Sequence, residues 1–333
     1  MPSNAKNLSE LLNTDSTVAV GDIADGSVTT AKLADDAVTN AKIGAGAVGT
    51  TEIANDAVTA AKQSGSIVGA FAFGGTITEY ESGGTVYRVH TFLSSNRISF
   101  TGTLVCDYLI VGGGGGSAAA EGYSGSTGGG GAGGMVVATS QSIAAGNYDV
   151  VVGAGGAAST NINAGAANGG NSSFNSHVGT GGGGGTDYVG SDAEKVGVAG
   201  GSGAGGSENL QTAGATNQNT YSGVTNVTGY GNAGGNGGAY ASGGSGGGGG
   251  AGGAGTAANG GTAAGGAGRA NNFRTGSNVT YAAGGAGVEG QTNGVAGGAN
   301  TGNGASGVST DSGGNTNGAA GGSGIVVIRY AVT

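Results

Sequence analysis

Tryptophan is absent from the 333 residues, and the chain has only one proline, one cysteine and two histidines. The near absence of proline excludes a collagen, which needs many prolines and a glycine at every third position. The single cysteine, Cys106, excludes an internal disulfide framework and a zinc site built on cysteines. His90 and His177 are too few for a histidine cluster. The sequence therefore predicts no metal and no other cofactor.

Charge and long apolar runs are also scarce. Only 9% of the residues are charged, the formal net charge is -9, and lysine and arginine form no cluster, which argues against nucleic acid or an anionic membrane as the partner. No stretch approaches the roughly 18 apolar residues of a membrane span, and the first residues lack the pattern of a secretion signal. We therefore expect a soluble protein, made in a cytoplasm, that does not insert into a membrane.

Glycine is abundant, with 85 residues, of which 12 lie in residues 1–110 and 73 in residues 111–333. This level normally indicates disorder, because each ordered glycine costs roughly 0.5–1 kcal/mol more than alanine. Strand-like segments border the glycine region on both sides, however, which argues that the region folds. We predict packed threefold extended helices joined by backbone hydrogen bonds, the polyglycine II arrangement, with runs such as 246–250 at the centre.

The segments that border the glycine region predict β structure. Two alternating runs flank Gly83 and Gly84, as in a hairpin, and residues 104–111 have apolar side chains on both faces, as in a strand covered on both sides. Residues 135–137 and 148–152 are expected to pair, and residues 325–330 to form a closing strand. We predict a small β domain over residues 66–111 and a glycine-rich domain over residues 112–333, so the fold is mainly β and irregular.

The N-terminal part contains a short amphipathic helix within residues 1–16, followed by a ten-residue repeat over residues 17–65. Each repeat has two apolar positions, and a unit this short cannot bury them alone. We therefore expect the repeats to stack around an axis shared by several chains, as an oligomeric shaft; a flexible linker is the alternative. One apolar position is occupied by Val28, Val38, Val48 and Val58.

The connections between the glycine runs are rich in asparagine, threonine, serine and tyrosine, which suits recognition. They comprise residues 186–196, 207–230 and 269–283. Aromatic side chains in or beside connections have little local core to join, so we take them as candidate binding residues, with packing across the glycine helices as the alternative. These candidates are Tyr188, Tyr221, Tyr230, Tyr240, Phe273 and Tyr281.

Catalytic patterns are weak. Asp187, Asp192 and Glu194 could supply a glycosidase pair, but we favour a role in keeping a nearly uncharged region soluble. Matches to G-x-G-x-x-G carry no weight at this glycine content. His177 has no recognisable partner in its polar loop, and Cys106 fits a buried position in an apolar strand.

Several motifs resemble a known family. YLIVGGGGG at 108–116, NYDVVVGAGG at 147–156 and GGSGIVVIRY at 321–330 resemble the glycine-rich domain of bacteriophage tail-fibre and adhesin proteins. SVTTAKLAD at 27–35 and DAVTNAKI at 36–43 resemble repeats near the N-terminus of tail fibres from phages of marine bacteria and cyanobacteria.

The resemblance implies a non-enzymatic tail-fibre protein, located in the tail appendage of a virion. Residues 1–16 would attach to the virion tail or to an adaptor protein, and residues 17–65 would form a homotrimer. The glycine-rich tip would bind a polysaccharide or an outer-membrane protein of the host surface. The best-known adhesins of this type are single chains on a fibre tip, whereas shaft and tip are fused here, so the oligomeric state of the tip stays open. A depolymerase tailspike and a structural glycine-rich surface protein are the alternatives.

Overall fold

The computed structural model describes residues 70–121, 125–187, 196–239, 244–310 and 315–332. Within these ranges the regular structure is β-strand, as the sequence predicted, and the remaining residues form extended segments and turns. The expected attachment segment (1–16) and the expected shaft (17–65) lie outside the described residues. The strands are β1 (Ala72–Phe73), β2 (Thr76–Ser82), β3 (Thr85–Phe92), β4 (Asn96–Phe100), β5 (Leu104–Val111), β6 (Ala120–Glu121), β7 (Gly125–Ser126), β8 (Met135–Ile143), β9 (Gly146–Val150), β10 (Ser172–Phe174), β11 (His177–Gly179), β12 (Val227–Tyr230), β13 (Arg269–Asn271), β14 (Val279–Tyr281), β15 (Ser309–Thr310), β16 (Asn315–Thr316) and β17 (Ile325–Val332).

Six strands form an antiparallel sheet in the order β12, β8, β5, β17, β3, β2. The predicted hairpin is confirmed, since Gly83 and Gly84 join β2 to β3 with φ angles of 59° and 78°. The prediction that residues 104–111 form a strand covered on both faces is confirmed as well. The side chains of β5 alternate between two buried clusters, with Cys106, Tyr108 and Ile110 in the first and Leu109 and Val111 in the second.

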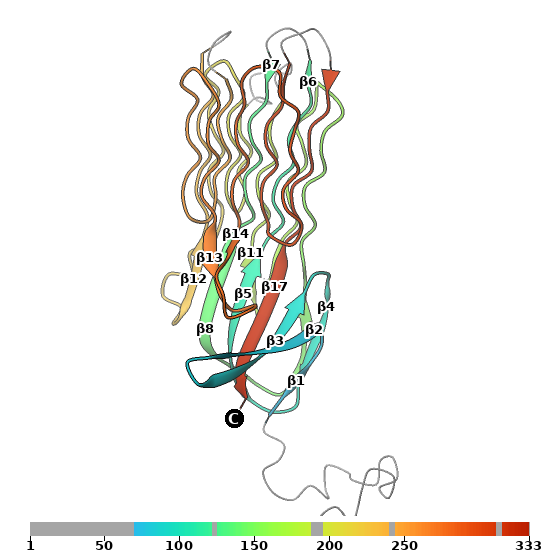
Figure 1. Ribbon diagram of the computed structural model, residues 1–333, viewed down its shortest axis with the longest axis vertical. Coiled ribbons are helices and arrows are strands. Elements are labelled where there is room, and N and C mark those ends of the chain that lie inside the picture. Colours follow the sequence, from blue (N-terminus) through green and yellow to red (C-terminus); the bar gives the residue numbers. More distant parts are fainter. Residues whose placement is uncertain (1–69, 122–124, 188–195, 240–243, 311–314, 333) are drawn as a thin grey trace, which may run out of the picture. The chain divides into compact units, whose positions relative to one another are not determined.

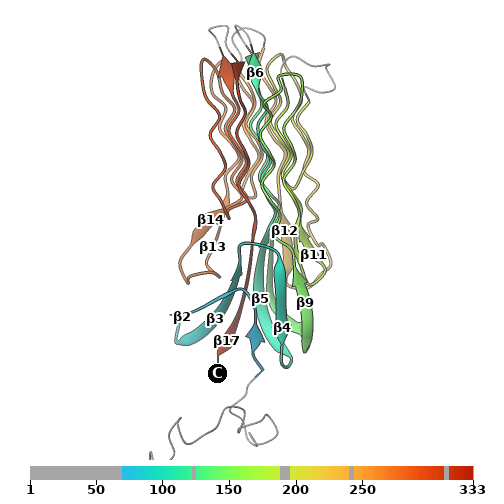
Figure 2. The same ribbon diagram turned by 90° about the vertical axis from the view of Figure 1, so that its right-hand side faces the viewer.

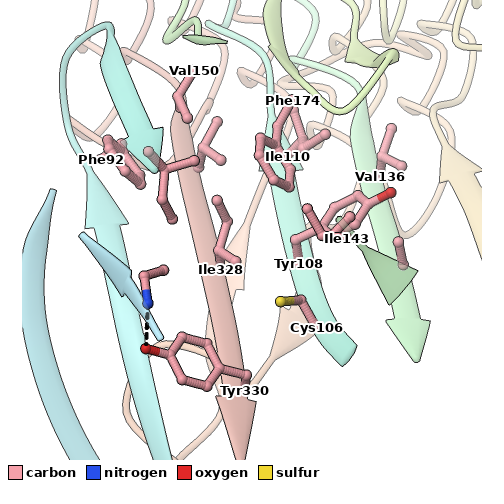
Figure 3. Close-up of a cluster of buried hydrophobic side chains, with 14 of the residues drawn as sticks. Phe92, Cys106, Tyr108, Ile110, Val136, Ile143, Val150, Phe174, Ile328 and Tyr330 are labelled. Carbon is pink, nitrogen blue, oxygen red and sulfur yellow. Dashed lines mark hydrogen bonds between the residues drawn. The ribbon is translucent and has the colours of Figure 1, made fainter. Parts of the chain in front are cut away.

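A smaller sheet, β1-β4-β9, covers one face of the large sheet. Ile98, Phe100 and Val150 from this small sheet pack against Tyr108 and Ile328, and Figure 3 shows part of the resulting first cluster. The expected pairing of residues 135–137 with 148–152 is wrong, because β8 pairs with β5 and β12 whereas β9 pairs with β4. The chain crosses from one sheet to the other between these strands, at Ala144 and Ala145.

The structure also corrects the predicted domain boundary after residue 111. The closing strand expected at 325–330 is confirmed as β17, and it lies between β3 and β5. Residues from before and after the glycine region therefore share one sheet, and residues 68–333 form one compact unit rather than two domains. A boundary drawn from glycine content misses this joint sheet, because composition does not report which distant strands pair.

The glycine runs extend from one end of the large sheet and lie side by side (Figures 1 and 2). Their backbone N–H groups donate to three different neighbouring segments in turn, and the pattern repeats every third residue. This alternation is what a threefold extended helix produces. In the first run, Gly112 and Gly115 donate to Gly134 and Gly131, Gly113 and Gly116 to Gly170 and Ala167, and Gly114 and Ser117 to Gly322 and Ala319.

Close packing of the backbones explains why these positions are glycine. A Cβ atom added at Gly114 would lie 2.0 Å from the carbonyl oxygen of Asn303, and one added at Gly115 would lie 2.0 Å from that of Gly183. The glycines predicted to be central, residues 246–250, are all buried. Backbone hydrogen bonds thus replace most of the side-chain core in this region.

Asparagine side chains serve as additional acceptors for this network. The Oδ1 atoms of Asn168 and Asn171 each accept a hydrogen bond, at 2.8 Å, from the backbone N–H of Gly184 and of Gly181 respectively. The two asparagines are three residues apart and so lie on one face of a threefold helix. Their amide oxygens take the place of backbone carbonyls, a role of asparagine that the composition of the sequence does not reveal.

Candidate functional site

The compact unit has two different ends. The described chain begins at Ala70 and finishes in β17 at the end that carries the large sheet, which we call the sheet end (Figure 1). At the opposite end, the glycine runs turn back on themselves, and β6 and β7 lie there. We call this the far end; its described turns are residues 158–163, 207–211, 258–262 and 289–293.

Short antiparallel pairings hold the far end together. β6 pairs with β16, and β7 pairs with β15, where the hydroxyl oxygens of Ser126 and Ser309 are 2.9 Å apart. The N–H of Glu208 donates to the carbonyl of Ser126, and Thr292 bridges to Ser309. The turns of the far end are therefore fixed to the bundle by backbone hydrogen bonds, while many of their side chains face solvent.

The turn at residues 207–211 displays an apolar side chain. Asn209 and Leu210 have φ angles of 73° and 57°, in the left-handed region that costs a residue such as leucine roughly 1–2 kcal/mol. The N–H of Leu210 donates to the carbonyl of Gly238 at 2.7 Å, and this bond helps to hold the turn. The Leu210 side chain is 71% exposed, so the strained turn presents it to solvent instead of burying it.

Charge is distributed unequally between the two ends. The five arginines of the chain lie in or beside strands at the sheet end: Arg88, Arg97, Arg269, Arg274 and Arg329. The described residues of the far end contain no lysine or arginine; they carry serine, threonine, asparagine and glutamine, with an exposed Glu289. Such a surface offers hydroxyl and amide groups for hydrogen bonding.

The six aromatic candidates do not form one site. Tyr188 and Tyr240 lie outside the described residues, although the described residues on either side of them are at the far end. Tyr221 and Tyr230 are half-buried at the sheet end. The Tyr221 hydroxyl donates to the carbonyl of Val178 and accepts from its N–H, and the Arg269 guanidinium lies 3.8 Å from the centre of the Tyr230 ring.

Phe273 and Tyr281 are core residues, which corrects their assignment as binding residues. Both are buried in the second cluster, with Phe273 only 5% exposed and Tyr281 fully buried. The hairpin of β13 and β14 folds back against the large sheet, where Arg329 lies 4.1 Å from the centre of the Phe273 ring. Neither ring has a free face on which a ligand could stack.

The described side chains with catalytic potential are buried or hydrogen-bonded. Asp187 is fully buried, whereas Asp192 and Glu194 lie outside the described residues. Nδ1 of His177 is 2.8 Å from the Tyr108 hydroxyl, a partner that the sequence did not reveal. Burial raises the pKa of the Cys106 thiol to about 12, so this cysteine is not a nucleophile near neutral pH. The described ranges bring no three histidine, cysteine or acidic side chains together as a metal site.

His90 is fully buried beneath the small sheet. Its Nδ1 lies 2.7 Å from the carbonyl oxygen of Gly74, which can only accept, so Nδ1 carries the proton of a neutral ring. Its Nε2 has no hydrogen-bond partner among the residues that the structure describes. Desolvation, assisted by the charge of Arg88, lowers the pKa of His90 below its ordinary value of 6.5.

We predict that acidification destabilises the protein through His90. As the pH falls below about 6.5, the unfolded chain takes up a proton that the folded chain does not, so the free energy of unfolding decreases. Desolvation lowers the pKa of His177 as well, and this group acts in the same direction. Urea unfolding at pH 7.5 and pH 5.0 measures the loss, which should be smaller in His90→Gln. Equal losses in the two proteins would contradict the assignment.

The described ranges contain no helix with the length and hydropathy needed to cross a bilayer. A family model described as a glycine-rich domain matches residues 94–331, from just before β4 to the last residues of β17. No curated protein matches the chain. The match covers the glycine runs and the strands from β4 to β17, and it leaves out β1, β2 and β3.

Proposed function

The chain belongs to the glycine-rich domain family, and from this premise we propose that it is a bacteriophage tail-fibre protein that binds the host surface through its far end. In this proposal, residues 1–16 attach to the virion tail or an adaptor, and residues 17–65 form a homotrimeric shaft. The protein is then part of the tail appendage of the virion. It acts by noncovalent recognition, and several fibres on one particle add avidity to a weak single contact.

The proposal rests on the position of the far end, which lies opposite the sheet end in the compact unit. The 69 residues that would connect to the virion join the compact unit at the sheet end, so the turns of the far end are the part most remote from this connection. Those turns can vary in side chain without altering the hydrogen bonds of the glycine runs, as a recognition surface requires. Hydroxyl and amide side chains, with one exposed leucine, suit a neutral sugar polymer or the loops of a surface protein.

The depolymerase alternative has little support. Cleavage of a polysaccharide needs two carboxyl groups on opposite sides of a sugar. Asp187, one of the three candidates, is fully buried and cannot reach a polymer in the described arrangement. We therefore do not assign catalysis to this chain.

Adsorption blocking tests the proposal. Purified full-length protein should compete with the parent phage for its host cells, and Leu210→Glu should raise the concentration needed for half-maximal blocking at least tenfold. Val105→Glu is the matched control, because Val105 is 61% exposed but lies in β5 at the sheet end. Failure of the unsubstituted protein to block at saturating concentration would overturn the proposal. An equal loss of blocking in Leu210→Glu and Val105→Glu would contradict the assignment of host binding to the far end.

A further inference from the structure

One part of the large sheet is not covered by the small sheet. On the side of the first cluster, the pairs Ile328↔His90 and Val326↔Phe92 lie beneath β1, β4 and β9, whereas the ends of β2, β3 and β17 extend beyond them. Ile77 is 48% exposed. Val86 of β3 and Val332 of β17 are direct partners on neighbouring strands, and both are also exposed. We call this surface the base patch, defined by Ile77, Glu79, Glu81, Val86, Arg88 and Val332.

An open groove borders the base patch. Its volume is about 390 Å³, and its lining comes from β1 and the residue before it, from β2, which is one of the two edge strands of the large sheet, and from Arg88 of β3. Phe71 and Phe73 supply one wall, with their rings edge to face at 4.8 Å, and Ile77 supplies the other. Among the described residues of the lining, the charged ones are Arg88 and Glu79, which form an ion pair at 2.7 Å. The groove is therefore apolar, with its charges neutralised internally.

An exposed apolar groove next to an unpaired strand edge favours association. The sequence before Ala70 indicates the partner. Sixty-nine residues precede Ala70, and in their repeats the valines at positions 28, 38, 48 and 58 cannot be buried within one unit. If copies of the chain associate through these repeats, each copy begins its compact unit directly beside its neighbours. Phe71, the residue after Ala70, already lines the groove.

We infer that the base patch and its groove contact a neighbouring copy of this chain, so that the compact units are held together at the sheet end as well as through the repeats. This inference rests on the proposed self-association of residues 17–65, and it does not depend on host binding. In a closed trimer the contact is heterologous, with the groove of one copy facing a different surface of the next. The far ends would then be presented together, three to a fibre.

Cross-linking of the full-length protein tests this contact. Glu81→Cys places a thiol at the exposed rim of the base patch, whereas the buried Cys106 does not react. Labelled there with a maleimide-benzophenone, the thiol should photo-cross-link to the surface of the neighbouring copy that faces it, which gives covalent dimers and trimers. Adding Ile77→Lys should lower the cross-linked fraction at least fivefold, while Val295→Lys, at a valine that is 66% exposed and lies outside the patch, should leave it unchanged. Val332→Lys, at the end of β17, provides a second disrupting variant, and circular dichroism verifies folding.

Light scattering on the same samples separates the outcomes. An oligomer whose Glu81→Cys cross-links are insensitive to both Ile77→Lys and Val332→Lys overturns the inference and leaves the shaft intact. A monomeric full-length chain overturns both the inference and the shaft. An oligomer whose Glu81→Cys label cross-links only within its own chain, to residues before Ala70, indicates that the chain's own N-terminal residues fill the groove, which also overturns the inference. Adsorption blocking by the unsubstituted protein and by Leu210→Glu tests host binding, independently of these measurements of self-association.

Discussion

Replacing Gly115 by alanine should destabilise the glycine bundle by about 1–3 kcal/mol or more, although it adds only one methyl group. The new Cβ would lie 2.0 Å from the carbonyl oxygen of Gly183. That oxygen cannot move away freely, because it accepts a hydrogen bond at 2.8 Å from the N–H of Gly131. If the Gly183 carbonyl moves to relieve the overlap, its hydrogen bond to Gly131 is lost, so the segments of Gly183 and Gly131 separate as well. Thermal and urea unfolding followed by circular dichroism measure the effect.

Gly253→Ala is the matched control. The nearest atom to a Cβ added at Gly253 is 3.9 Å away, and its φ angle is outside the left-handed region. Alanine at such a site should be neutral or should stabilise by about 0.4–1 kcal/mol, since it restricts the unfolded chain. Equal stabilities of Gly115→Ala and Gly253→Ala would contradict the view that backbone contact, and not composition alone, requires glycine in the interior.

Arg329→Leu should lower the free energy of unfolding by about 3–5 kcal/mol. The Arg329 guanidinium contacts Asp107 at 2.9 and 3.0 Å, donates to the Tyr80 hydroxyl and lies over the rings of Tyr87 and Phe273. The two charged side chains are only 13% and 20% exposed, so leucine would leave the Asp107 carboxylate in a poorly solvated site. Equilibrium urea unfolding gives the magnitude.

Two further variants identify the cause of this loss. Arg97→Leu removes a similar ion pair with Asp149, but the two side chains there are 60% and 76% exposed, so the change should cost about 0–1 kcal/mol. The double variant Arg329→Leu with Asp107→Leu should regain much of the stability, because no charge is then left unpaired. If the double variant is less stable than Arg329→Leu, the unpaired carboxylate is not the source of the loss.

The sequence revealed local structure more reliably than pairing between distant strands. Alternating apolar residues identified β5, and the segment at 325–330 identified β17, because these patterns depend on near neighbours. The position of β17 between β3 and β5 was not predictable, since no local pattern states which distant strands pair. The same limit explains the wrong pairing of β8 with β9. Glycine content predicted backbone packing but concealed the joint sheet.

The binding candidates were predictable only in part. All the connections between glycine runs looked alike in composition, yet successive connections lie at opposite ends of the bundle. Counting the runs would have separated the far-end turn at 207–211 from the sheet-end segment around Tyr221, since the run from 212 to 218 lies between them. Burial of Phe273 and Tyr281 depends on contact with the distant Arg329 and its sheet, which the sequence does not report.

The glycine runs contact one another mostly through backbone atoms, so few side chains determine which run packs against which neighbour. The N–H groups of Gly181 and Gly184 donate to asparagine side-chain oxygens, where other glycines of the runs donate to backbone carbonyls. Recombination between genes that inserts or removes a pair of runs therefore meets no mismatch of packing, provided that glycine keeps its threefold spacing. Such a protein can acquire a new turn at its far end by exchange of whole segments, without waiting for compensating substitutions elsewhere.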